Sequence, residues 1–173
     1  LSGGTLGGSA NVTVSGLLTW SDGTMSGTGK TIANGGMTIS GGGVKYLTGR
    51  TIDNAGVATW TGTGYIYSIS ASSVFNNLAS ATFDIQNNEY FYNNGTFNNA
   101  GTVRKSAGTG TTTFSGGVFN NTGTVEVQSG TLSLASGGTS SGTFSGLAWT
   151  TLNFGGGTHT LSDTSGISST GTV

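Results

Sequence analysis

The sequence predicts an all-β chain folded as a parallel β-solenoid, or β-helix, of about seven to eight coils of 20–23 residues. Three observations predict this fold: a repeat of about 22 residues, short runs in which apolar and polar residues alternate, and glycine clusters between those runs. The 173 residues include 34 Gly and no Pro. Because so much Gly is normally typical of low-complexity chains, the repeat decides the fold class.

The repeat is clearest in the string Phe-Asn-Asn-x-Gly-Thr-Val, which occurs at Phe97–Val103 and at Phe119–Val125. Weaker copies upstream share an Asn that follows an apolar residue by two positions, and these Asn residues are 20, 23, 22 and 22 positions apart. The aligned pairs are Ile32 with Asn34, Ile52 with Asn54, Phe75 with Asn77, Phe97 with Asn99, and Phe119 with Asn121. We expect the apolar residues to stack inward and the Asn residues to form one corner column, bonded amide to amide.

The best strand candidates are Thr124–Val127 and Thr131–Leu134, which alternate apolar and polar residues on either side of a Gly-containing corner. No window shows the spacing of a helix. A unit of about 22 residues cannot bury its own apolar face, so each coil has to stack on the next at about 4.8 Å. A β-sandwich is the alternative, but it gives no reason for a constant spacing of the Asn residues. We expect residues 1–173 to form a single solenoid segment of a longer protein, with the aligned repeats centred on 30–135.

Three strings resemble the β-helical repeat regions of large bacterial surface and secreted adhesin-like proteins, the autotransporter-passenger class. They are Leu18–Gly29, Phe97–Gly108 and Phe119–Leu134. The resemblance implies a right-handed β-helix that is exported to the bacterial cell surface or beyond, belongs to a longer protein and is anchored elsewhere in it. It carries over no catalytic residue.

Composition excludes several classes of function. Five Lys and Arg residues and a net charge of −1 give no electrostatic footprint for nucleic acid or for an anionic membrane, and no apolar run is long enough to enter one. No Cys and one His leave no zinc site, and the calcium-binding repeat of some solenoids is missing. Gly27–Thr31 resembles the end of a phosphate-binding loop, but its first glycine is out of register. We expect no metal and no cofactor.

Catalysis by paired carboxylates is also disfavoured. Relative to the aligned Asn, Asp53, Asp84 and Glu126 fall at different positions, so we expect them in different columns. His159 is expected to be an outward surface residue of an alternating strand. The sequence therefore predicts a protein that is not an enzyme.

The tyrosines are the best candidates for a binding site. Tyr46, Tyr65, Tyr67, Tyr90 and Tyr92 precede their aligned Asn residues on what should be one side of the solenoid. We expect Phe91 to point inward and Tyr90 and Tyr92 to face outward together. Beside Tyr67 they would form a platform for a glycan, with Glu89 and Asn94 bonding its hydroxyls. The alternative is that these rings only cover the sheet beneath them.

A second candidate surface consists of threonines such as Thr111–Thr113, because flat Thr arrays can bind ice. Only a few coils carry such pairs, and we do not expect them in one column.

Two further expectations follow from the register. Arg104 and Glu126 should be outward neighbours one coil apart. Lys105 occupies a position where Trp60, Phe83 and Val127 are apolar and only Ser40 is not. We expect the stem of Lys105 to pack inside and its ammonium to reach a corner and bond carbonyls, rather than a bulge to turn it outward.

The sequence favours a non-catalytic structural or adhesive module of a large exported bacterial protein. A carbohydrate-binding surface is the first alternative, and an ice-binding Thr face is the second. The expected partners are neighbouring domains of the parent protein, cell-surface glycans and other copies bound end to end.

Overall fold

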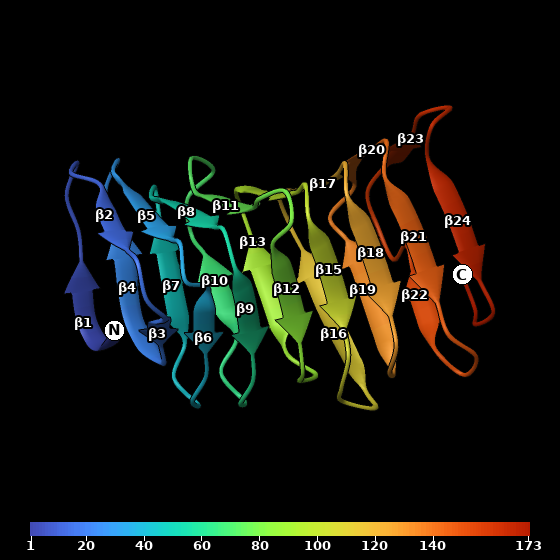
Figure 1. The fold of residues 1–173 in the computed structure, drawn as a ribbon, viewed down its shortest axis with the longest axis horizontal. Helices are drawn as coiled ribbons and strands as arrows, with labels where there is room; N and C mark the ends of the chain where they lie inside the picture. The colour runs from blue at the N-terminus through green and yellow to red at the C-terminus, as the bar shows by residue number, and fades with distance from the viewer.

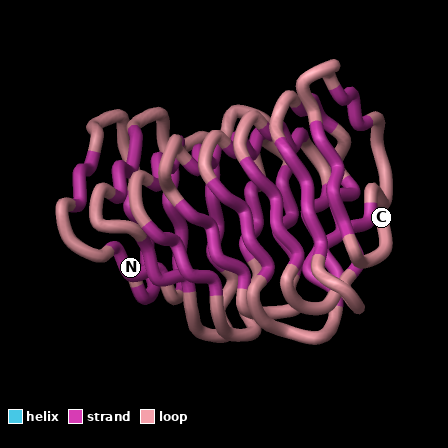
Figure 2. The backbone as a smooth tube through the Cα atoms, turned by 45° about the vertical axis from the view of Figure 1, so that its right-hand side comes forward, coloured by secondary structure: helices cyan, strands magenta, loops and turns pink.

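The computed structural model describes residues 1–173 as 24 strands and no helix, wound into eight coils of three strands (Figures 1 and 2). The three strands of each coil belong to three parallel sheets of eight strands each, so the chain is a parallel β-solenoid as predicted. The coils follow one another along the longest axis of the molecule, from the N-terminus to the C-terminus (Figure 1).

Every third strand belongs to the same sheet. Sheet A contains β1 (Ser2–Leu6), β4 (Asp22–Ser26), β7 (Lys45–Thr48), β10 (Ile66–Ser68), β13 (Tyr90–Asn93), β16 (Thr111–Ser115), β19 (Thr131–Ala135) and β22 (Thr151–Asn153). Sheet B contains β2 (Val12–Val14), β5 (Lys30–Ala33), β8 (Thr51–Asn54), β11 (Val74–Asn77), β14 (Thr96–Asn99), β17 (Val118–Asn121), β20 (Gly138–Ser140) and β23 (His159–Leu161). Sheet C contains β3 (Leu18–Trp20), β6 (Met37–Ile39), β9 (Val57–Trp60), β12 (Thr82–Ile85), β15 (Thr102–Lys105), β18 (Thr124–Val127), β21 (Thr143–Gly146) and β24 (Gly166–Ser169).

The core is a set of inward columns, one side chain per coil. In sheet B, Ile52, Phe75, Phe97 and Phe119 lie in register and are buried, as predicted. The ring of Phe97 stacks on those of Phe75 and Phe119 with centroids 5.1 and 5.3 Å apart and interplanar angles of 6° and 5°. Alternation along each strand thus buries one set of side chains and leaves the other on the surface.

An inner asparagine ladder follows this core column. Each side-chain amide donates to the carbonyl oxygen of the next Asn: Asn54 to Asn77 at 2.9 Å, Asn77 to Asn99 at 2.8 Å and Asn99 to Asn121 at 2.8 Å. Asn121 ends the ladder on the hydroxyl of Ser140 at 3.3 Å. All four Asn residues are buried, so the predicted corner column is confirmed for them.

The prediction for the first copy of the repeat is wrong by one residue. Ile52 pairs with Thr31 and Asn54 with Ala33, and both partners are buried, whereas Ile32 faces outward and Asn34 is exposed. Apolarity alone favours the wrong phase here, because Ile32 is more apolar than Thr31, but the inward Thr31 hydroxyl accepts a 2.7 Å hydrogen bond from the buried Arg50 side chain. The inner ladder therefore begins at Asn54.

A second, outer ladder follows the outward column of sheet B and was not predicted. Asn76 donates to the Asp53 carboxylate at 2.7 Å, Asn98 to Asn76 at 2.9 Å and Asn120 to Asn98 at 3.0 Å. Because an ionised carboxylate only accepts, Asp53 fixes the direction of this ladder, which donates toward the N-terminal coils. The inner ladder donates toward the C-terminal coils.

Three basic side chains are fully buried at the corners, where backbone carbonyls turn inward. The Arg50 guanidinium donates to Thr31 and to the carbonyls of Gly8, Ala10, Ser26 and Lys30, at 2.7 to 3.3 Å. The Lys45 ammonium donates to the carbonyls of Gly41, Gly43 and Gly64 at 2.9 to 3.3 Å. Neither burial was predicted.

The stem of Lys105 packs inside, as predicted. Its ammonium donates to the carbonyls of Asn87 and Ala107 at 2.6 and 3.1 Å and to the hydroxyl of Thr112 at 3.1 Å. The predicted inward column of Lys105 is correct for Trp60 and Val127. It is wrong at two positions, because Ile85 and Ile39 lie where Phe83 and Ser40 were expected.

Burial lowers the pKa of Lys105 to about 8, from the usual 10.5. At a pH between the folded pKa of about 8 and the unfolded pKa of 10.5, the unfolded chain binds more protons than the folded protein. The free energy of unfolding should therefore rise with pH across this range. We expect urea unfolding to show a larger rise between about pH 7.5 and 10 for the protein than for Lys105→Met. Burial also lowers the pKa of Lys45. Because both proteins contain Lys45, its contribution to the pH dependence cancels in the comparison. An equal pH dependence in the two proteins would contradict this assignment.

The outward column of sheet C holds Asp84, Arg104 and Glu126 in successive coils. The predicted register of Arg104 with Glu126 is confirmed, but Arg104 binds Asp84, at 3.0 Å. The expectation that Asp84 and Glu126 occupy different columns is wrong. The corner before β12 contains a four-residue turn, closed by a 3.0 Å bond from the Ala81 amide to the Leu78 carbonyl, and this turn shifts Asp84 into the column.

Candidate functional site

All five tyrosines of the chain lie together on sheet A, in the middle of the solenoid. Tyr46 of β7, Tyr67 of β10 and Tyr92 of β13 occupy one outward column in register. Tyr90 lies on the same side of β13, two residues before Tyr92, and Tyr65 directly precedes β10. We call these five residues the tyrosine cluster.

The rings of the cluster are in contact with one another across the three coils. The centroids of Tyr46 and Tyr67 are 6.0 Å apart, those of Tyr67 and Tyr92 5.8 Å, and those of Tyr65 and Tyr92 5.6 Å. These three pairs are tilted or edge-on, with interplanar angles of 47° to 81°. Tyr90 instead stacks on Tyr92 at 5.0 Å and 8°. The cluster is therefore a contiguous aromatic surface with angled walls.

Tyr46, Tyr65, Tyr67 and Tyr92 alone line a hollow of about 310 Å³. Side-chain hydrogen bonds next to the cluster are made by Asn87 and Asn94, and none is made by a tyrosine hydroxyl. Tyr90 and Tyr92 are 44% and 39% exposed. The hollow thus presents apolar ring surface together with hydroxyls that are free to bond a ligand.

The predicted site residues are brought together in part. Phe91 is buried and Tyr67, Tyr90 and Tyr92 share one surface, as expected. Glu89 is half-buried, and its charge acts on the Lys45 ammonium at the corner before sheet A. Asn94 lies beyond the other end of β13 and donates to the Ile69 carbonyl at 3.2 Å. Glu89 and Asn94 therefore lie beyond opposite ends of β13, with the tyrosines between them.

Tyr46 and Tyr65 complete the hollow, although the predicted binding residues did not include them. The repeat places both on the correct side. Their contribution depends on ring contacts between coils of unequal length, which periodicity alone does not specify.

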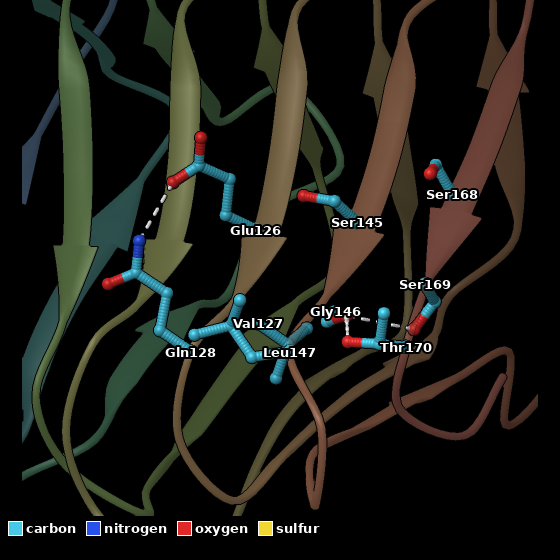
Figure 3. A pocket seen from close by; sticks show the side chains of 9 residues that line it. All are labelled: Glu126, Val127, Gln128, Ser145, Gly146, Leu147, Ser168, Ser169 and Thr170. Atoms are coloured by element: carbon cyan, nitrogen blue, oxygen red, sulfur yellow. Dashed lines mark hydrogen bonds between the residues drawn. The ribbon is translucent and has the colours of Figure 1, made fainter.

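A second hollow, of about 380 Å³, lies on sheet C over β18, β21 and β24 (Figure 3). It forms because large side chains give way to small ones along two columns: Gly146 follows Val127, and Ser145 follows Glu126. The Gln128 amide donates to the Glu126 carboxylate at 3.1 Å (Figure 3). Glu126 is the one titratable residue among those that line this hollow, so the hollow contains no acid–base pair.

A third hollow, of about 480 Å³, lies at the C-terminal end, and His159 is one of the residues that line it. The prediction that His159 faces outward is wrong. His159 is half-buried, in register with Gly138 of an inward column. Its Nε2 lies 3.0 and 3.1 Å from the carbonyls of Leu134 and Gly156, and its ring contacts Phe154 at 4.8 Å. Because carbonyl oxygens only accept hydrogen bonds, Nε2 has to carry the proton and donate it to them. The His159 ring therefore helps to pack the C-terminal coil.

Threonines form columns that were not expected. Thr111, Thr131 and Thr151 lie in register on sheet A, and Thr82, Thr102, Thr124 and Thr143 do so on sheet C. In sheet A the outward column two residues further along the strands contains Thr113 in β16, but Ser133 in β19 and Asn153 in β22. A regular Thr-x-Thr array is therefore confined to one strand.

No group of three or more His, Asp or Glu side chains is close enough to hold a metal ion. The structure also contains no helix that is long and apolar enough to cross a membrane. Comparisons with protein-family models, with curated proteins and with solved structures find no match. The class that fold and site define is a parallel β-solenoid with a tyrosine-rich face.

Proposed function

We propose that this chain is a non-catalytic structural and adhesive module, a stiff solenoid segment of a larger exported bacterial protein that displays a contact surface. The observation that carries the proposal is the continuity of the core and of both asparagine ladders across the central coils. Each coil is joined to the next by backbone bonds and stacked side chains, and the central coils also by amide pairs, which suits a segment that has to hold its shape between other domains.

Hydrogen exchange tests the structural part of this proposal. The amides of β8, β11, β14 and β17 should be protected to a similar degree, because each of these strands is paired on both sides. Free exchange in one of these central strands at native conditions would contradict a stiff segment.

Carbohydrate binding by the tyrosine cluster is the second candidate function. The specific observation in its favour is that all five tyrosines gather on one face with their hydroxyls unbonded and a hollow between four of them. Aromatic rings with polar tips combine apolar contact and hydrogen bonding, which is what a saccharide surface requires.

Replacement of Tyr90 and Tyr92 together by Ala tests this second function. We expect the binding of cells or glycans to be lost while the melting temperature changes little, because both side chains are substantially exposed. Val57→Ala with Val118→Ala is a matched control, since these side chains are exposed on sheets C and B. Unchanged binding with a lower melting temperature would show that the cluster only covers the sheet.

A further inference from the structure

The five basic side chains of this protein are all occupied within the fold. Lys45, Arg50 and Lys105 are fully buried and bonded at corners. The other two are paired with acids on the outer surface: Lys30 with Asp53 at 3.2 Å on sheet B, and Arg104 with Asp84 at 3.0 Å on sheet C. No unpaired lysine or arginine side chain is therefore available to a partner.

The acidic side chains are not occupied to the same extent. Asp22, Glu89, Glu126 and Asp163 form no salt bridge, so the accessible charge of the molecule is negative. Glu89 directly precedes Tyr90, and Lys45 directly precedes Tyr46 in β7. The Lys45 ammonium bonds three carbonyls at its corner and is not exposed. An anionic ligand on the tyrosine cluster would find no accessible cation to pair with, whereas the Glu89 carboxylate beside the cluster is not paired in a salt bridge.

The direction in which the tyrosine rings follow one another constrains the shape of the ligand. Tyr46, Tyr67 and Tyr92 follow one another in consecutive coils, with ring centroids 6.0 and 5.8 Å apart. The column runs along the solenoid axis, across the strands. A ligand that contacts all three rings has to extend along that axis, as a chain molecule does and a single small ring does not.

We infer that the tyrosine cluster binds an uncharged saccharide chain laid along the solenoid axis and rejects acidic glycans. This inference rests on carbohydrate binding as the second proposed function. Recognition comes from contact with the aromatic rings and from hydrogen bonds to the free tyrosine hydroxyls. Because no ion pair contributes, binding should depend little on salt.

A glycan array that carries neutral oligosaccharides of increasing length and acidic ones, probed at about 50 and 500 mM salt, tests this inference. We expect binding to neutral chains only, increasing with chain length and changing less than about twofold with salt. Tyr67→Ala should weaken it at least about tenfold, because Tyr67 contacts both other rings of the column. Val57→Ala is the control and should bind as the unchanged protein does.

A gain of charge provides the second arm. Thr113 of β16 pairs with Tyr90 of the preceding coil and faces the same side, so Thr113→Lys places a cation beside the cluster. This variant should acquire salt-sensitive binding to acidic glycans. Binding of the unchanged protein to acidic glycans, lost in Tyr67→Ala, would overturn the inference and leave the second proposed function standing. Binding to neither class would overturn both.

Discussion

Replacement of Arg50 by Met is expected to destabilise the protein by about 3 to 5 kcal/mol, because several buried hydrogen bonds from a charged donor are lost together. The Arg50 side chain is fully buried, and its five N–H groups have five acceptors. Those acceptors belong to the first and second coils, whereas Arg50 belongs to the third. Met fills a similar volume but removes all five of these hydrogen bonds, and only the Gly8 carbonyl has a second donor outside the strand ladders, the Gly29 amide at 3.1 Å.

The loss should be concentrated at the N-terminal end. We expect a lower unfolding midpoint in urea together with faster hydrogen exchange in β2 and β5, because Arg50 ties their corners to the third coil. Lys30→Met is a suitable control: its side chain is 48% exposed and makes one ion pair, and the Asp53 carboxylate left behind still accepts from Asn76, so we expect a loss of about 1 kcal/mol or less. If the two variants lose the same stability, Arg50 does not act as a clamp.

Phe97→Ala is expected to cost about 3 to 5 kcal/mol as a truncation in a packed core. The Phe97 ring stacks between Phe75 and Phe119 and meets the edges or faces of Phe83, Phe91 and Phe114 at 5.1 to 5.5 Å. The coil interior cannot collapse easily into the space left, because backbone hydrogen bonds hold the neighbouring coils at a fixed spacing.

Equilibrium unfolding in urea measures this cost. Thr96→Ala is the matched control, since Thr96 precedes Phe97 in β14 and faces outward, and its truncation should change stability by about 0.5 kcal/mol or less. A loss for Phe97→Ala no larger than for Thr96→Ala would contradict the predicted inward column.

The repeat was sufficient to predict the architecture, because a Phe and an Asn at nearly constant spacing require stacked coils. It identified the inward column from Ile52 to Phe119 and the ladder from Asn54 to Asn121. It failed at Ile32 and Asn34, because Thr31 and Ala33 face inward there and the Thr31 hydroxyl accepts a hydrogen bond from the buried Arg50 side chain. A buried polar partner can therefore override the phase that the apolar pattern indicates.

Corner geometry was the other source of error. The turn at Leu78–Ala81 adds residues between aligned strands and moves Asp84 into the column of Glu126. Corners also provide the inward carbonyls that hold Lys45 and Arg50, and nothing in the repeat indicates how many carbonyls converge at one corner. The tyrosines could be assigned to one face from sequence, but the hollow between them depends on the three-dimensional contacts of their rings.

Cysteine cross-linking tests the coil register that assembles the tyrosine cluster, and the natural chain contains no Cys to interfere. Tyr67 and Tyr92 are direct partners in adjacent coils, so Tyr67→Cys with Tyr92→Cys has the Cα separation of about 5 Å that a disulfide needs. In the control, Tyr67→Cys with Tyr90→Cys, both thiols are on the same side of the sheet. Position 90 is two residues away from the direct partner of position 67, which is beyond the reach of a disulfide. Mild oxidation of the monomer should therefore close the first pair within the chain and leave the second reduced. Closure of the second pair but not the first would contradict the register on which the fold and the site both depend.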